Sequence, residues 1–347
     1  MLNKILENAR GVSKIFLIAG LPVTYQKGDH PVRQKGDILN PDTIREIVNE
    51  MYKQSEREET ILVNSKDDDF SFSIPKLGRF RCNVFYQRGS LAAVIKVIKF
   101  GIPSYKEMGI PEMVMDIANN RKGLVLVTGE AGSGKTTTLS CLIDKINHER
   151  DGHIITLENP IEHTHRHDKS MVTQREIFID TPGFKEGLRG AMKEKPSVIF
   201  MSELQEDIAQ DALTACEMGI LLMSSMYTTS AVDTIERFLD IFPMAYRKQA
   251  QNRLSNMLSA IVCQKLIPSK DGHQIPVFEI LRMKPIVKDM IRKDNLLKLE
   301  GVMQASDDMA TMDDTLLKLY NAGRITKETV VDNCTHYDVM VRKLGIG

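Results

Sequence analysis

Residues 124–136 decide the fold of this chain, and their sequence is Leu-Val-Leu-Val-Thr-Gly-Glu-Ala-Gly-Ser-Gly-Lys-Thr. The apolar run Leu124–Thr128 predicts a buried strand, and the glycine-rich turn that follows has the spacing of a phosphate-binding loop. Backbone N–H groups of such a turn can all point inward, and a helix that begins near Lys135 adds the positive end of its dipole. These residues therefore predict a site that cradles the phosphates of a nucleotide.

The side chains of this loop indicate what the site would bind. Lys135 would reach the β and γ phosphates as a point charge, and the Thr136 hydroxyl would ligate the Mg²⁺ that bridges them. Glycine is needed because a side chain would block close approach of the ligand. A glycine-rich turn without a ligand is the alternative, and it is disfavoured because the turn lies between a predicted strand and a predicted helix. The predicted nucleotide contacts are Gly129, Glu130, Ala131, Gly132, Ser133, Gly134, Lys135, Thr136 and Thr137.

The composition of the chain limits its function classes. At 347 residues the chain is long enough for two domains, each with its own core. Lysine plus arginine equals aspartate plus glutamate at 46 each, so no net charge draws the protein to DNA, RNA or anionic lipid. The five cysteines are far apart and lack metal-ligand spacing, which is typical of a reducing cytosol. No segment approaches the roughly 18 apolar residues of a membrane-spanning helix, so we expect a cytoplasmic protein that reaches a membrane only through partners.

Two domains joined by a short linker are predicted from the pattern of apolar runs. Residues 1–100 alternate short apolar runs with turns, which predicts a small α+β domain. Residues 101–112 contain two glycines and two prolines, the composition of a linker, and residues 113–347 form the second domain. In the first domain the pattern predicts a helix that begins at Pro41 and runs through Met51, and strands at 15–18, 67–74, 79–85 and 92–98.

Two arginines lie on one face of the predicted strand 79–85. Because side chains alternate across a strand, Arg79 and Arg81 project together while Phe80 takes the other face. Arg88 follows in the next turn. Guanidinium groups match phosphate oxygens, so Arg79, Arg81 and Arg88 are candidates to stabilise charge on a nucleotide held by a neighbouring subunit. An ordinary surface hairpin is the alternative.

The second domain is predicted to have an α/β fold. Continuous aliphatic strands alternate with helical stretches, which is typical of a parallel sheet covered by helices on both faces. Ligands of such sheets bind at the carboxyl ends of the strands. The last stretch, residues 283–347, is predicted to be helical. The predicted strands are Leu124–Thr128, His153–Leu157, Val198–Met201 and Ile220–Met226.

Two glutamates follow predicted strands at this edge of the sheet. Glu158 follows the strand after the loop helix, where a carboxylate can orient the water that attacks the γ-phosphate. Glu203 follows the apolar strand Val198–Met201, where an acid would support Mg²⁺ through water. We therefore predict catalytic roles for Glu158, Glu203 and Lys135, with Thr136 and Glu203 at the metal. A solvated glutamate at a strand end is the alternative for each acid.

Together these motifs resemble those of the secretion and pilus ATPases, and within them the PilT-like twitching-motility ATPases that retract type IV pili. The likeness spans nearly the whole chain. It rests on residues 15–22, 78–83 and 87–90, which resemble the PAS-like N-terminal domain of the family, and on residues 129–136, 174–176, 228–231, Arg237 and 240–243, which resemble its RecA-like motor domain.

The resemblance implies a fold, an assembly and partners. It implies a RecA-like P-loop NTPase domain preceded by a smaller PAS-like α+β domain, and hexameric rings that bind ATP between the two domains of a subunit. Arginines of the neighbouring N-terminal domain reach that site in the family, so Arg79, Arg81 and Arg88 become candidate nucleotide-sensing residues. The implied partners are further copies of the chain and a pilus platform protein at the inner membrane.

The chain departs from the family pattern at positions that bear on the chemistry. Asn159 replaces the usual aspartate after Glu158, and Gln205 stands where an arginine is usual. Ile220 and Tyr227 each replace a histidine. These changes remove one negative charge and up to three groups that could contact phosphate, while the loop is intact. Nucleotide binding should therefore persist better than fast hydrolysis.

The sequence thus predicts an ATPase that uses ATP and Mg²⁺ in a hexameric ring to drive pilus retraction, bound peripherally at the inner face of the cell membrane. A catalytically weakened paralogue that binds ATP and regulates an active pilus ATPase is the alternative. The four substitutions favour that alternative, and the intact Glu158, Glu203 and Lys135 oppose it. A nucleic-acid translocase is disfavoured by the zero net charge and the absence of tryptophan, so no nucleic-acid partner is expected.

Overall fold

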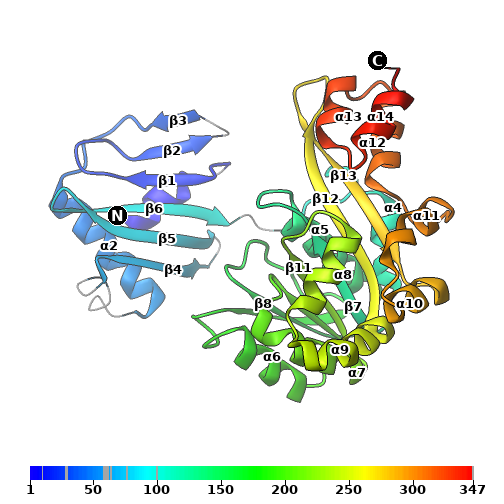
Figure 1. The fold of residues 1–347 in the computed structure, drawn as a ribbon. Helices are drawn as coiled ribbons and strands as arrows, with labels where there is room; N and C mark the ends of the chain where they lie inside the picture. The colour runs from blue at the N-terminus through cyan, green and yellow to red at the C-terminus, as the bar shows by residue number, and fades with distance from the viewer. Residues whose placement is uncertain are drawn as a thin grey trace. The chain divides into compact units, whose positions relative to one another are not determined.

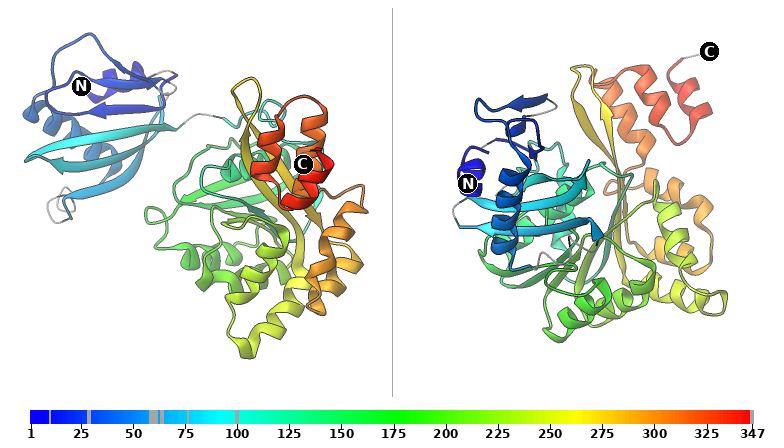
Figure 2. Two further views of the ribbon diagram at one scale, coloured as in Figure 1. Left: turned by 45° about the horizontal axis from the view of Figure 1, so that its top comes forward. Right: turned by 90° about the vertical axis from the view of Figure 1, so that its left-hand side faces the viewer.

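The computed structural model describes residues 1–9, 11–27, 30–57, 62, 65–75, 77–98 and 101–345. The chain divides into two compact units, whose ribbons are drawn in Figure 1 and from two further sides in Figure 2. One unit comprises Met1–Gly101 with Glu162–Thr164, and the other comprises Ile102–Ile161 with His165–Gly347. Phe100 and the last two residues, which fall within predicted segments, lie outside the described residues.

The smaller unit is an antiparallel sheet with α1 and α2 packed against it (Figure 1). Its six strands follow the order β3-β2-β1-β6-β5-β4. Asn40 caps the N-terminus of α2, because its side-chain oxygen accepts a hydrogen bond from the Thr43 N–H at 2.8 Å, and Pro41 suits the first helical turn. The predicted helix and four strands of this domain are confirmed. The elements are α1 (Leu2–Glu7), β1 (Lys14–Leu17), β2 (Thr24–Lys27), β3 (His30–Arg33), α2 (Pro41–Ser55), β4 (Asp67–Ile74), β5 (Gly78–Gln87) and β6 (Ser90–Ile98).

The larger unit is built on a seven-stranded sheet in the order β13-β12-β7-β11-β10-β8-β9. Neighbouring strands are parallel except for the pair β12 and β13, which is antiparallel. The four predicted strands are present, whereas the sequence pattern does not predict β9, β12 and β13. The strands are β7 (Gly123–Thr128), β8 (Gly152–Glu158), β9 (Ser170–Glu176), β10 (Val198–Met201), β11 (Leu221–Met226), β12 (Leu258–Pro268) and β13 (Gln274–Arg282).

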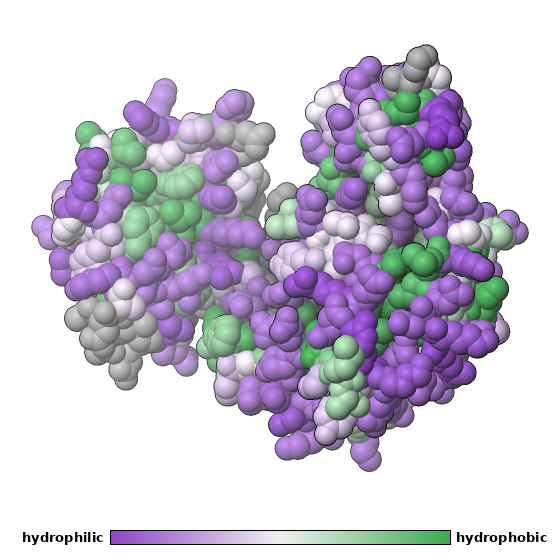
Figure 3. Space-filling model, in the orientation of Figure 1, coloured by the Kyte–Doolittle hydropathy of each residue, from purple (hydrophilic) through white to green (hydrophobic). Residues whose placement is uncertain are grey.

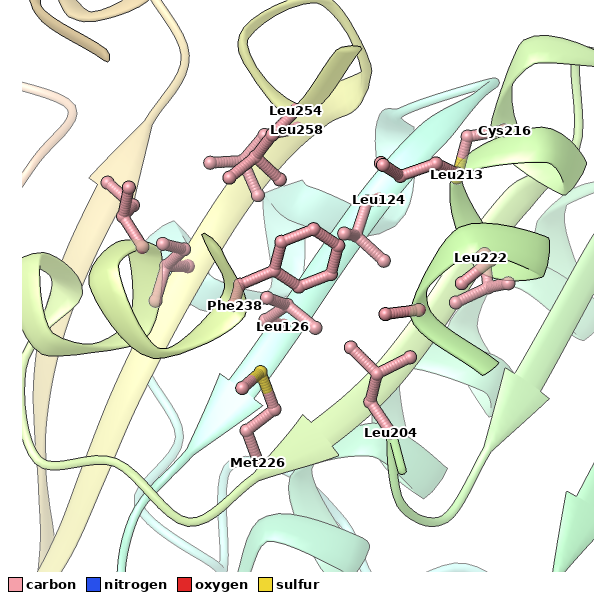
Figure 4. Packing of buried hydrophobic residues seen from close by; sticks show 14 of the residues in the cluster. Leu124, Leu126, Leu204, Leu213, Cys216, Leu222, Met226, Phe238, Leu254 and Leu258 are labelled. Carbon is pink, nitrogen blue, oxygen red and sulfur yellow. The ribbon is translucent and has the colours of Figure 1, made fainter. Parts of the chain in front are cut away.

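Helices cover both faces of this sheet because the side chains of each buried strand alternate between two apolar cores. Leu124 and Leu126 of β7 lie in one core, and Val125 and Val127 lie in the other. Figure 4 shows the Phe238 ring of α8 beside Leu124 and Leu126 in the first core. The first core is covered by α6 (Phe184–Lys193), η2 (Glu206–Ile208), α7 (Ala209–Glu217), α8 (Ala231–Asp240), α9 (Met244–Met257), α10 (Pro285–Arg292), η3 (Leu296–Lys298) and α11 (Leu299–Gln304), and the second by α4 (Glu112–Met115), η1 (Asp116–Asn119) and α5 (Lys135–Glu149).

The last three helices form a separate apolar cluster with the far ends of β12 and β13. These helices are α12 (Met312–Asn321), α13 (Lys327–Asn333) and α14 (Tyr337–Lys343). They pack on Ile267, Ile275 and Val277 of the two strands. The predicted helical character of the last stretch is confirmed for its described residues. The predicted fold class, an α/β domain preceded by a smaller α+β domain, is confirmed as well.

Residues of the predicted linker contribute to the larger unit. Ile110 is buried in the same core as α5, and Ile102 and Tyr105 pack against that core. The assignment of residues 101–112 as a linker stays a prediction.

The described helices do not include one long and apolar enough to cross a membrane. Figure 3 shows one face of the molecule, on which hydrophilic residues cover most of the larger unit and hydrophobic residues form smaller patches. Most large apolar side chains of the strands lie in the cores, and Met171 of β9 and Leu266 of β12 are among the exposed ones.

Candidate functional site

The predicted site residues of the larger unit lie at or just after the carboxyl ends of three strands of the same sheet. β7 ends at Thr128 before the loop, β10 ends at Met201 shortly before Glu203, and β8 ends at Glu158. The strand registers place these ends at the same edge. With about 4.8 Å between strands, β10, which precedes Glu203, and β8, which ends with Glu158, lie roughly 10 and 14 Å from β7. The structure therefore brings the loop and both glutamates to one edge of the sheet.

Backbone geometry explains two glycines of the loop. Gly134 caps the N-terminus of α5 with a φ of 90°, and Gly129 has a φ of 147°. A Cβ atom on Gly129 would lie 2.2 Å from the backbone oxygen of Gln264. A Cβ atom on Gly134 would lie 2.8 Å from the Gln264 side-chain nitrogen. The loop thus packs directly against β12, which leaves no room for side chains at these two positions.

Other features of the loop fit a phosphate ligand. A Cβ atom on Gly132 would meet no atom within 4 Å, so this side of the loop is open. The Ser133 hydroxyl is buried and has no hydrogen-bond partner within the described part of the chain. A buried hydroxyl without a partner is unfavourable, and a phosphate oxygen would satisfy it. The residues present therefore fit a nucleotide phosphate.

Lys135 folds back onto its own loop. Its Nζ atom donates hydrogen bonds to the carbonyl oxygens of Gly129 at 2.9 Å and Glu130 at 2.7 Å. The same atom lies 4.4 Å from the centroid of the Tyr227 ring. Burial lowers the pKa of Lys135, while the carboxylates of Glu203 and Glu130 act in the opposite direction. The charge of Lys135 is therefore stabilised by these carboxylates and by its two carbonyl acceptors.

Glu203 is half-buried and lines a cavity of about 290 Å³. Gln205 and Tyr227 line the same cavity, and so does Arg237, which lies on α8. Glu203 is therefore reached from this cavity, which also contains the first residue after β11.

Glu158 is buried and held by two hydrogen-bond donors. The Thr156 hydroxyl donates to Glu158 Oε1 at 2.6 Å, and the Gln174 side-chain amide donates to the same oxygen at 3.1 Å. Gln174 comes from β9. On the same strand, Glu176 accepts a hydrogen bond from the Ile161 N–H at 3.3 Å. β9 therefore fixes both Glu158 and the turn that follows β8.

Gln264 of β12 supports the loop and was missed by sequence reasoning. Its buried side chain accepts a hydrogen bond from the Thr138 hydroxyl of α5 at 2.7 Å. Its backbone oxygen and amide nitrogen are the atoms that exclude side chains at Gly129 and Gly134. A glutamine that interrupts a largely apolar run is the signal that could have found it.

Glu279 of β13 is a second buried residue that sequence reasoning missed. It lies opposite Cys263 of β12, and Cys263 lies opposite Thr128 at the end of β7. The Glu279 carboxylate accepts hydrogen bonds from the N–H groups of Ala231 at 2.7 Å and Met312 at 3.4 Å, the first residues of α8 and α12. Burial raises the pKa of Glu279, and these two hydrogen bonds oppose that rise. Glu279 thus joins two helix N-termini behind the loop.

The three arginines of the smaller unit lie towards different ends of β5. Arg81 donates to the Asp69 carboxylate through Nε at 2.8 Å and Nη2 at 2.6 Å, which forms a fork-like ion pair between β5 and β4. Arg79 Nη1 donates to the Ser73 hydroxyl at 3.5 Å. Arg88 lies in the turn after β5 and is exposed. At about 3.3 Å per residue, Arg88 is roughly 23 Å from Arg81 along the strand, so the structure does not bring them together. Their roles at a nucleotide stay predictions.

The four departures from the family pattern have different surroundings. Ile220 is buried in the first core, where it fills space. Asn159 and Gln205 are exposed, and the Asn159 N–H donates to the Ser202 hydroxyl at 3.1 Å. Tyr227 is the one of these four residues with a described contact to the loop, because its ring lies beside Lys135.

Two groups of residues have the oxygen or nitrogen atoms that a metal needs. Thr136 and Glu203 offer a hydroxyl and a carboxylate, which suit Mg²⁺. The described residues also bring together Glu300, Asp313 and His336. In that cluster, Asp313 Oδ2 accepts hydrogen bonds from the His336 backbone N–H and from His336 Nδ1, both at 3.1 Å. These bonds explain the second cluster as a link between helices.

Adding a methyl group at Gly129 should disrupt the loop. We expect Gly129→Ala to lose nucleotide binding and to lower the melting temperature, because the new Cβ would meet backbone of β12. Gly219→Ala is the matched control, because Gly219 also has a positive φ of 93° but no atom within 4 Å of the new Cβ. That variant should lose about 1 kcal/mol of stability and keep binding. Equal nucleotide affinity in the two variants would contradict the described packing of the loop.

Comparison with known proteins places this geometry in a family. A family model described as type II/IV secretion system protein matches residues 92–333. The type IV pilus retraction ATPase PilT of Pseudomonas aeruginosa is 33% identical over 329 residues, which cover 92% of this chain and 93% of PilT. The type IV pilus ATPase PilU of the same organism is 33% identical over 343 residues, which cover 97% of this chain and 89% of PilU.

A solved structure agrees with these sequence relatives. The crystal structure of the pilus retraction motor PilT with bound ADP superposes with a TM-score of 0.90 and 37% sequence identity, and the match covers 98% of both chains. The chain therefore belongs to the type II/IV secretion system protein family, among the PilT-like pilus motor ATPases.

Proposed function

We propose that this chain hydrolyses ATP in a hexameric ring and thereby drives the retraction of a type IV pilus. The observation that carries the proposal is the glycine-rich loop before α5, which shares the carboxyl edge of the sheet with Glu158 and Glu203. Similarity to a pilus retraction motor that binds ADP supports it.

The predicted site residues at the carboxyl edge of the sheet each have a proposed role in hydrolysis. The loop amides bind the phosphates, and Lys135 leaves its two carbonyl acceptors to bind the β and γ phosphates. Glu158, fixed by Thr156 and Gln174, orients the attacking water. Thr136 and Glu203 would hold Mg²⁺, which would supply positive charge against the phosphates.

The assembly and location of the protein follow from the same proposal. The smaller unit is the N-terminal domain, residues 113–347 are the motor domain, and residues 101–112 join them. Six copies form the ring, in which Arg79, Arg81 or Arg88 approaches the nucleotide of the neighbouring copy. The ring lies at the cytoplasmic face of the inner membrane, where a pilus platform protein is its partner.

A second candidate function is favoured by three features of the site. Tyr227 covers Lys135, and Asn159 and Gln205 replace charged residues of the family pattern. A chain of this kind could bind ATP without turning it over and could regulate a paralogous pilus ATPase within a mixed ring.

Phosphate release by the purified chain separates the two candidates. The motor predicts steady-state turnover that falls by about 100- to 1,000-fold in Glu203→Gln, because the metal loses a charged support. Glu236→Gln is the control, because Glu236 is an exposed residue of α8. Light scattering in the same samples gives the ring size. ATP binding without turnover by the unmodified chain would reject the motor and favour the regulator.

A further inference from the structure

The ammonium group of Lys135 is satisfied entirely by groups of the protein. An ammonium has three N–H donors, and two of them bind the carbonyl oxygens of Gly129 and Glu130. The face of the Tyr227 ring, 4.4 Å from Nζ, serves as the third partner. We propose that Tyr227 is a positioning residue that holds Lys135 against its own loop until the phosphates of a nucleotide displace the ring contact. This inference rests on the proposed binding of a nucleotide at the loop.

Strand order explains why Tyr227 reaches Lys135. β11 lies next to β7, and Met226 at the end of β11 is aligned with Thr128 at the end of β7. Tyr227, which follows β11, and Gly129, which follows β7, therefore leave the sheet side by side. Tyr227 is 56% exposed, so the ring lies at the surface of the site and can move without disturbing a core.

The ring contact stabilises the ligand-free state of the site. Lys135 is only 7% exposed, so water does little to solvate its charge. The ring and the carboxylates of Glu203 and Glu130 compensate for part of that loss. A contact that exists only without ligand lowers the apparent affinity for any ligand that needs the released lysine.

The effect of Tyr227 on nucleotide affinity should depend on which phosphates the nucleotide carries. In a phosphate-binding loop the lysine reaches the β and γ phosphates. ATP and ADP must therefore displace the Tyr227 contact, whereas AMP, which has neither phosphate, does not need to. A change at Tyr227 that only disturbed the structure would alter the affinity for all three nucleotides.

The test compares two substitutions of similar size in the full chain. Tyr227→Leu keeps an apolar side chain but removes the ring, and it should tighten the binding of both ATP and ADP by between about 2- and 30-fold. Tyr227→Phe keeps the ring face and should bind both nucleotides within about twofold of the unmodified chain. The affinity for AMP should be the same in all three proteins. Isothermal titration calorimetry with ATP, ADP and AMP measures each value.

The outcomes separate this inference from the proposed function. Unchanged ATP and ADP affinity in Tyr227→Leu would overturn the inference, and so would a Tyr227→Phe variant that behaves like Tyr227→Leu. An equal shift for AMP would also overturn it, because the effect would then be structural. Failure of the unmodified chain to bind ATP would instead reject the proposed function.

Discussion

Replacing Lys135 by alanine should lower the rate of ATP hydrolysis by about 100- to 1,000-fold. The substitution removes the only positive charge of the loop, since the remaining donors of residues 129–136 are uncharged amides and hydroxyls and Glu130 is acidic. It also removes the two hydrogen bonds to the loop carbonyls. Phosphate release at saturating ATP gives the rate.

Lys145→Ala is the matched control for this prediction. Lys145 lies on the same helix and forms an ion pair with Glu149 at 2.6 Å, away from the loop. Exposed pairs of this kind contribute little, about 0.3–0.5 kcal/mol, so the variant should keep its activity. If Lys135→Ala hydrolysed ATP as fast as Lys145→Ala, the loop would not be the site of the reaction.

Replacing Glu158 by glutamine should slow hydrolysis by about 100- to 1,000-fold while leaving the affinity for ATP within about threefold. Glutamine has nearly the same shape, and its amide oxygen can still accept the hydrogen bonds from Thr156 and Gln174. The charge that orients and polarises the attacking water is lost. A rate measurement at saturating ATP and a binding titration together separate the two effects.

A structural role for Glu158 would give a different result. Glu236→Gln again serves as the control with unchanged activity, and the melting temperature of each variant reports on folding. If Glu158→Gln kept full activity, Glu158 would serve to join β8 and β9 rather than to orient water. If it lost ATP affinity and turnover equally, its role would be to position the nucleotide.

Much of the fold could be predicted because the loop motif indicates a strand directly before it and a helix directly after it. The apolar run before Gly129 predicts β7, and α5 begins at Lys135 as expected. The strands β8, β10 and β11 are short, apolar and bounded by polar residues, which makes them easy to recognise. β12 was missed because its long apolar run follows a helix and periodicity alone cannot distinguish it from a buried helix.

Two other strands were missed for a related reason. β9 is an edge strand with polar residues, including Gln174, and lacks the apolar run of the central strands. Among the described strands, β13 pairs with β12, so its assignment depends on a strand that the pattern did not reveal.

Site residues at the ends of recognised strands could be predicted from the sequence. Site residues whose contacts depend on which strands are neighbours in the sheet could not. Glu158 and Glu203 follow recognised strands, and the rule that ligands bind at the carboxyl edge is sufficient to place them. Gln264 lies 126 residues after its partner Thr138, and their contact requires β12 to lie beside β7. Tyr227 was identified only as a departure from the family, because its contact with Lys135 requires β11 to lie on the other side of β7.

Hydrogen–deuterium exchange of the loop tests the central claim most directly. In the proposed site the amides of residues 129–136 bind the phosphates of ATP. ATP with Mg²⁺ should therefore slow exchange in a peptide that contains this loop, and Gly129→Ala should abolish the protection. Unchanged exchange in this peptide at saturating ATP, with protection elsewhere in the chain, would show that the nucleotide binds at another site.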